Sequence, residues 1–142
     1  MSLARDLRAV TAEAALAAVK AAVAAAAARG VAVVAAVVDP GGHLVASLRG
    51  DGAFAASIGI AHDKAWTAAI FKASTEGLAA GLSGNPVLLA GIAARPNVVL
   101  FGGGLPMSHE GAVIGGIGVS GGSEDDDRAA AAAGLAALGL SA

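Results

Sequence analysis

Three histidines are the side chains of this sequence best suited to transfer protons or to bind a ligand: His43, His62 and His109. There is no cysteine, which excludes thiolate metal sites, disulfides and a cysteine nucleophile. No two of the histidines are four residues apart, and no HExxH sequence is present. The pattern therefore predicts no metal centre.

His62 is the most informative histidine because it falls in a segment whose apolar residues have helical spacing. It lies four residues before Trp66, which places the imidazole and the indole on one helix face. A neutral histidine beside an aromatic side chain can ligate haem iron, and the same pattern fits a histidine packed in the core. His43 and His109 fall at turns, where surface or hydrogen-bonding roles are expected.

Charged residues make up only 14% of the chain, so those that follow apolar segments are candidates for a site. Arg49 ends an apolar segment, and Lys64 follows in the next predicted helix. Two cations that converge there would bind a carboxylate or a phosphate. The alternative is that both form structural ion pairs, Arg49 with Asp51 and Lys64 with another aspartate. Asp39 ends an apolar run, where its ordinary role is to cap a turn.

A glycine pattern, Gly116-x-Gly118-x-x-Gly121, matches the dinucleotide-binding fingerprint letter by letter. The fingerprint opens a βαβ unit and is followed about 20 residues later by an acidic residue. Here the last acidic residue is Asp127, and the chain ends soon after it. The glycines therefore predict a tight strand end and close packing of a helix on a strand.

Composition excludes two classes of partner. A net charge of −2 and a pI near 5.8 argue against binding to the nucleic-acid backbone, and 3% aromatic residues argue against base stacking. The longest uncharged run, residues 77–94, contains glycines and Asn85-Pro86, which a membrane-spanning helix would not tolerate. We expect a cytoplasmic protein that binds neither membranes nor nucleic acids.

Periodicity and turn residues predict the following elements. Helices are expected at residues 14–28, after an N-cap at Thr11, at residues 54–75, and after Asn85-Pro86 and Ser123. A β-hairpin is expected over residues 31–49, and further strands at residues 98–101, 105–108 and 112–120. Two hairpins and covering helices indicate an α+β fold with a mainly antiparallel sheet. We expect a single domain that spans residues 1–142.

Several motifs occur in an order that resembles the GlcG/HbpS family, also known as the haem-degrading, PduO C-terminal-like or DUF336 domain. The resemblance covers residues 11–138 and rests on Val37-Val-Asp-Pro-Gly-Gly-His-Leu-Val45, Arg49-x-Asp51-Gly-Ala53, Lys64-Ala-x-Thr-Ala68, Gly102-Gly-Gly-Leu-Pro106 and Gly115-Gly-Ile-Gly-Val-Ser-Gly-Gly122. It implies a three-layer αβα domain with about five strands. It also implies homo-oligomers, from dimers to octamers, and relatives that bind haem or a corrinoid. The iron-ligating residue is not shared among those relatives.

These observations lead to two main hypotheses and a third. The first is a small cytosolic ligand-binding protein whose ligand is haem or another tetrapyrrole, held by His62, Arg49 and Lys64. The second is a cofactor-free enzyme, of isomerase or lyase type, that acts on a small anionic carbonyl or carboxylate metabolite. Arg49 and Lys64 would then bind the anionic group, and His62 or Asp39 would act as acid and base. A structural or regulatory subunit is the third possibility.

Overall fold

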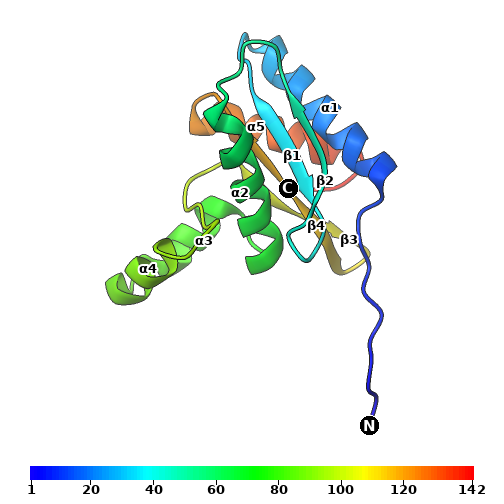
Figure 1. Ribbon diagram of the computed structural model, residues 1–142, viewed down its shortest axis with the longest axis vertical. Coiled ribbons are helices and arrows are strands. Elements are labelled where there is room, and N and C mark those ends of the chain that lie inside the picture. Colours follow the sequence, from blue (N-terminus) through cyan, green and yellow to red (C-terminus); the bar gives the residue numbers. More distant parts are fainter.

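The computed structural model describes residues 1–142 and contains five helices and four strands (Figure 1). In chain order these are α1 (Ala12–Ala28), β1 (Val34–Val38), β2 (Leu44–Arg49), α2 (Ala56–Phe71), α3 (Thr75–Leu82), α4 (Pro86–Ala93), β3 (Gly104–His109), β4 (Ala112–Ser120) and α5 (Glu124–Ala136). No helix is both long and apolar enough to cross a membrane.

The strands form one antiparallel sheet in the order β2-β1-β4-β3. Helices α1 and α5 cover one face, and α2 covers the other (Figure 1). The predicted α+β class with helices on both sides of an antiparallel sheet is confirmed, with four strands where about five were expected. β3 is an edge strand, which is where Pro106, lacking an N–H group, can be accommodated.

The sequence predicts a strand at residues 98–101, and the structure shows none there. The reason lies in the hydrogen bonds of this segment. The N–H of Val99 donates to the Thr67 hydroxyl at 3.0 Å. This N–H therefore forms its hydrogen bond with a side chain of α2 and not with a neighbouring strand. The helix predicted over 54–75 is shorter in the structure, where it spans Ala56–Phe71, because Lys72 adopts a left-handed conformation (φ 56°) and ends α2 at Phe71.

The glycines of β4 let α2 lie directly on the strand. A side chain at Gly118 would collide with the carbonyl oxygen of Ala61, and one at Gly116 with that of Ala65. Close packing of a helix on a strand, rather than nucleotide binding, therefore accounts for these glycines, as the sequence predicted. This contact fixes the position of α2 and of every side chain that it carries.

Helices α3 and α4 form an arm that projects from the body of the protein (Figure 1). Asn85 caps α4 by accepting a hydrogen bond from the N–H of Leu88 at 3.1 Å, and Pro86 is its first residue. The helix predicted after Asn85-Pro86 is thus present. None of its residues is buried.

Candidate functional site

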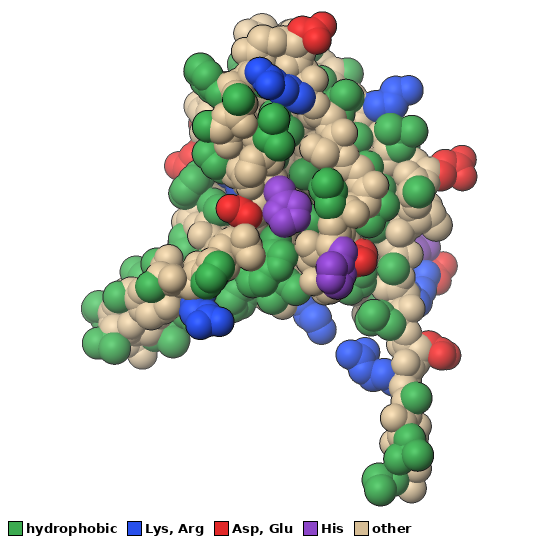
Figure 2. All heavy atoms as spheres, viewed as in Figure 1, with side chains coloured by type: hydrophobic (Ala, Val, Ile, Leu, Met, Phe, Trp, Pro, Cys, Tyr) green, Lys and Arg blue, Asp and Glu red, His purple; other side chains and the backbone are tan.

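Helix α2 carries a row of large side chains at intervals of four residues, beginning with Phe54 just before the helix. We call this row the α2 stripe: Phe54, Ile58, His62, Trp66 and Ile70. Residues four apart are neighbours on a helix surface. The opposite side of α2 is buried against the sheet, so the stripe lies at the surface. Figure 2 shows histidine side chains on this face among apolar ones.

His62 lies in the middle of the stripe and is partly buried, with 34% of its side chain exposed. Its Nδ1 atom is 3.5 Å from Oδ1 of Asp63. When a carboxylate lies on the Nδ1 side of an imidazole, Nε2 is the nitrogen left to bind a ligand or to transfer a proton. Geometry at His62 therefore permits either role that the sequence suggested.

Trp66 joins the stripe to the turn between β1 and β2. Its indole lies against Gly42, where any side chain would overlap the indole atoms, and its ring meets Phe71 edge-on at 6.4 Å between centroids. Gly42 has a φ of +84°, a conformation that glycine adopts without strain. The turn is therefore held close to the centre of the stripe.

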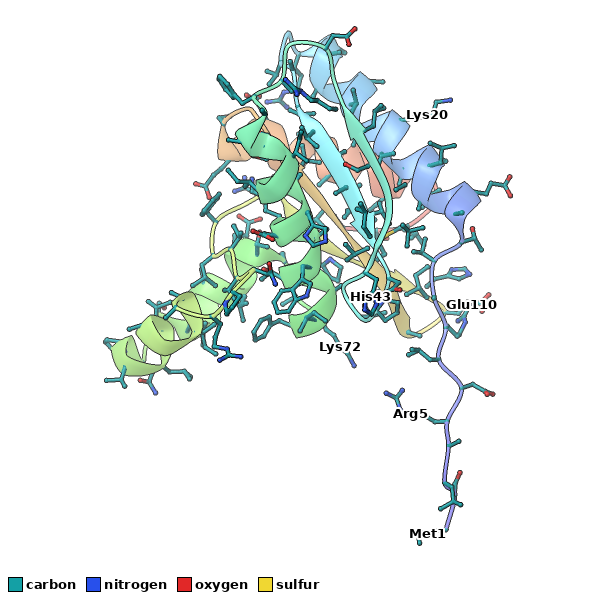
Figure 3. The ribbon with its side chains drawn as sticks, viewed as in Figure 1. Met1, Arg5, Lys20, His43, Lys72 and Glu110 are labelled. Carbon is teal, nitrogen blue, oxygen red and sulfur yellow. The ribbon has the colours of Figure 1, made fainter.

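Asp39 organises that same turn. Its Oδ1 atom accepts hydrogen bonds from the backbone N–H groups of Gly41 (2.9 Å) and His43 (3.0 Å), and lies 3.3 Å from Nδ1 of His43. His43 itself points outward at the turn (Figure 3). This capping role was one of the two expected for Asp39, and its role as an acid–base group stays a prediction.

Arg49 lies at the end of β2 and is exposed. In the sheet it pairs with Val34, which packs toward α2, so its side chain starts on the same face of the sheet. Its Nε atom donates to the carbonyl oxygen of Ala53 at 3.1 Å, and no carboxylate lies within 4 Å of it. The terminal guanidinium nitrogens thus remain available for an anionic group.

Lys64 points in the opposite direction, into the interior. Its ammonium group is 2.9 Å from Oδ2 of Asp127 and donates to the carbonyl oxygen of Val119 at 2.8 Å, while the ring of Phe101 lies 5.1 Å from it. Both members of the ion pair are buried. The structure therefore brings Arg49 and His62 to one face of the molecule, and places the Lys64 ammonium beneath it with a carboxylate partner.

Thr67 is a residue of this region to which the sequence assigned no role. Its hydroxyl group lies 2.8 Å from the Asp63 carbonyl, 2.9 Å from that of Asn97 and 3.0 Å from the N–H of Val99. It ties α2 to the segment that leads from the arm into β3. The only signal in the sequence was its place in the motif that begins at Lys64.

The two larger cavities do not include the centre of the stripe, although Ile70 at its end lines one of them. One, of about 560 Å³, lies between the N-terminal segment and the end of α2, and another, of about 520 Å³, lies beside α5. His62 lines neither of them. The stripe is therefore an open surface that suits a flat ligand or a covering protein better than a small enclosed metabolite.

Comparison with known families decides the classification: residues 10–136 match the family of HbpS-like haem-degrading proteins. The chain belongs to this family. An uncharacterised 15.0 kDa protein encoded in the dhaT–dhaS intergenic region of Citrobacter freundii is 35% identical, over 90% of this chain and 91% of that protein.

Solved structures of relatives agree with the fold. A double mutant of HbpS from Streptomyces reticuli is 40% identical, with a TM-score of 0.85 over 96% of this chain and 90% of that one. A PduOC:heme complex is 33% identical, with a TM-score of 0.82 over 91% of this chain and 94% of that one. The resemblance noted in the sequence is thereby confirmed.

Proposed function

We propose that this chain is a small ligand-binding protein that holds haem, or another tetrapyrrole, against the α2 stripe. The observation that carries the proposal is a partly buried imidazole in the middle of an exposed apolar row, with a guanidinium free of carboxylates on the same face. The solved complex of the related PduOC with haem supports it. We further propose that the protein acts in the cytoplasm as a homo-oligomer.

The residues present fit such a ligand. Ile58 and Trp66 flank His62 on the stripe and offer apolar contacts to a flat macrocycle, while Nε2 of His62 is the nitrogen placed to bind the metal. Arg49 would bind a propionate through its terminal nitrogens. Haem, when bound, supplies an iron centre for ligand binding or electron transfer. Lys64 would contribute to this site from below, by fixing α2 through its pair with Asp127.

A second candidate, a cofactor-free enzyme of isomerase or lyase type, is favoured by one observation. The carboxylate of Asp63 lies 3.5 Å from Nδ1 of His62, an arrangement that orients an imidazole for proton transfer. Arg49 would bind the carboxylate of the metabolite and Asp39 would be the further polar group, while Lys64, buried against Asp127, would act only by holding α2 in place. In this case His62→Ala lowers turnover by about two to four orders of magnitude without lowering thermal stability.

Titration with haem tests the first proposal. We expect a saturable shift of the Soret band in the wild type, with micromolar or tighter affinity. His62→Ala should move the position of the band, because the metal loses its nitrogen ligand. His43→Ala is the matched control, since His43 is exposed at the neighbouring turn and should leave the spectrum unchanged. An unchanged band in His62→Ala, or a wild type whose spectrum equals that of free haem, would contradict the proposal.

A further inference from the structure

The cavity between the N-terminal segment and the end of α2 has the size of a binding site. Its volume of about 560 Å³ falls within the roughly 300–1,000 Å³ that is usual for small-molecule sites. The turn after β1 and the turn between β3 and β4 complete its wall. His62 and Arg49 do not line it, so neither function proposed above uses this cavity.

Basic side chains outnumber acidic ones in the lining of this cavity. Arg5, Arg8 and Lys72 line it, against the single carboxylate of Asp6. Lys72 extends from the end of α2, and Arg5 from the N-terminal segment, into the same space (Figure 3). Neither of these two has a carboxylate within 4 Å. Cations that meet in a cleft without a counter-charge attract anions to it.

The N-terminal segment is fixed at the point where it forms the wall of the cavity. The guanidinium of Arg8 lies 3.2 Å from Oε2 of Glu110, in the turn between β3 and β4. Two residues later, the N–H of Val10 donates to the carbonyl oxygen of Ile114 at 2.8 Å. Arg8 is therefore neutralised within the chain and anchors the wall. Arg5 is the arginine of this segment that is left to bind a ligand.

Lys72 occupies a backbone position that favours glycine. It follows the last residue of α2 and has a φ of 56°, the left-handed conformation in which helices most often end with glycine. A lysine there costs stability relative to glycine, because its Cβ atom crowds the backbone. No ion pair within the chain offsets this cost. A less favourable residue thus stands where its ammonium group enters the cavity.

The apolar part of the lining narrows the class of ligand. Leu7, Ile70 and Val113 contribute apolar side chains from three separate segments. A bare inorganic anion would leave these side chains in water, whereas an organic molecule would cover them. Lysine and arginine both bind phosphate, and a phosphate monoester carries nearly two negative charges at neutral pH. Two unpaired cations match that charge.

We propose that this cavity binds an organic phosphate monoester. The phosphate lies between Arg5 and Lys72, and the apolar part of the molecule lies against Leu7, Ile70 and Val113. A soluble metabolite and a lipid headgroup can both present this chemistry. The site is separate from the centre of the α2 stripe, so the proposal does not depend on haem.

Titration of the ligand-free protein with phenyl phosphate, followed by NMR, tests the site. We expect saturable shifts of the amide signals of Gly41 and Gly111, which line the cavity. Phenol lacks the phosphate and inorganic phosphate lacks the apolar body, so each should bind at least about tenfold more weakly. Absence of saturable shifts, or equal affinities for phenol and phenyl phosphate, would overturn the proposal.

Lys72→Gly separates binding from stability. Glycine relieves the left-handed conformation, so Tm should rise, while the affinity for phenyl phosphate should fall about tenfold or more because a cation is lost. Arg5→Gln should weaken binding to a similar extent. Lys20→Gln removes the same charge from an exposed position of α1 and should leave the affinity unchanged. A Lys72→Gly variant that binds as tightly as the wild type would refute the site.

Vesicles identify the source of the phosphate. Phosphatidylcholine vesicles with and without phosphatidic acid, whose headgroup is a phosphate monoester, are sedimented with the protein. Binding that needs phosphatidic acid and is lost in Lys72→Gly would assign the site to a lipid headgroup. No sedimentation, together with binding of phenyl phosphate, would assign it to a soluble ester. No haem is used, so failure of the haem titration leaves these outcomes unaffected.

Discussion

Lys64 and Asp127 are 63 residues apart in the sequence, yet Nζ of the first lies 2.9 Å from Oδ2 of the second in the protein interior. The other carboxylate oxygen of Asp127 accepts the N–H of Gly122 at 2.9 Å, and Lys64 also donates to the carbonyl of Val119. One buried pair therefore joins α2, β4 and the start of α5. This pair holds the α2 stripe in place from the buried side of the helix.

Breaking this pair should destabilise the protein strongly. Lys64→Met leaves Asp127 buried without its cation, for which a loss of about 3–5 kcal/mol is expected. In a chain of this length that corresponds to a fall in Tm of roughly 10 °C or more. Lys20→Met, at an exposed position of α1, should leave Tm nearly unchanged. A Lys64→Met variant as stable as the wild type in a thermal melt would refute this account of the pair.

The close contact between α2 and β4 predicts that substitution by alanine changes the stability in opposite directions at two glycines. Gly118→Ala places a methyl group against the Ala61 carbonyl and should cost about 1–3 kcal/mol or more, because neither backbone can move freely. Gly59→Ala, on the exposed side of α2 with open space around it, should stabilise by about 0.5–1 kcal/mol. Urea denaturation of both variants measures the difference. If the two changes had the same sign, α2 would not lie as closely on β4 as described.

The start of α5 predicts a dependence of stability on pH. Hydrogen bonds from the side chain and backbone of Ser123, together with Arg29, hold the pKa of Asp126 below its ordinary value. A depressed pKa means that the ionised carboxylate stabilises the fold above the pKa of the unfolded chain. The stabilisation is lost as pH falls through the lower pKa of the folded protein.

Asp126→Asn should therefore be less stable than the wild type at neutral pH, and the difference should shrink to nothing in strong acid. Unfolding measured from about pH 7 down to about pH 2 would test this expectation. Asp6→Asn, in the exposed N-terminal segment, is the control. A difference between Asp126→Asn and the wild type that did not change with pH would show that the carboxylate charge is not the cause.

Arg49 provides a test of how the proposed ligand is oriented. Arg49→Ala should weaken haem binding by up to about tenfold, since a solvent-exposed pair with a propionate contributes roughly 1 kcal/mol. The position of the Soret band should stay that of the wild type, because the nitrogen ligand is unchanged. Arg95→Ala, another exposed arginine, should have no effect on affinity. Equal affinities of Arg49→Ala and the wild type would remove Arg49 from the site.

Much of the fold follows from local signals in the sequence. Thr11 and Ser123 cap α1 and α5 as expected, each accepting a backbone N–H at 3.1 Å, and the hairpin turn falls at Asp39-Pro40. These features depend on residues close to one another in the chain. The prediction for residues 98–101 was wrong because their apolar character suits a strand, whereas the hydroxyl of Thr67, 32 residues before Val99, competes for its N–H group.

The candidate site was harder to predict for the same reason. The helical spacing predicted that His62 and Trp66 share a face, and it placed Lys64 elsewhere on the helix. It did not show which of the four acidic residues at the start of α5 turns inward to meet Lys64. Asp127 does so because it lies on the buried side of α5. The carboxylates of the other three contact Gly102, Arg29 and Arg128 instead. That assignment depends on how α5 docks on the sheet.

Trp66 is the single tryptophan of a chain that has no tyrosine, and the fold places it in the α2 stripe against the turn at Gly42. Nearly all of the ultraviolet fluorescence of the protein would therefore come from one point, four residues from His62. Occupation of the stripe by a chromophore or loosening of the turn would each change that emission. The protein thus contains its own spectroscopic probe, located where the proposed ligand would meet the turn.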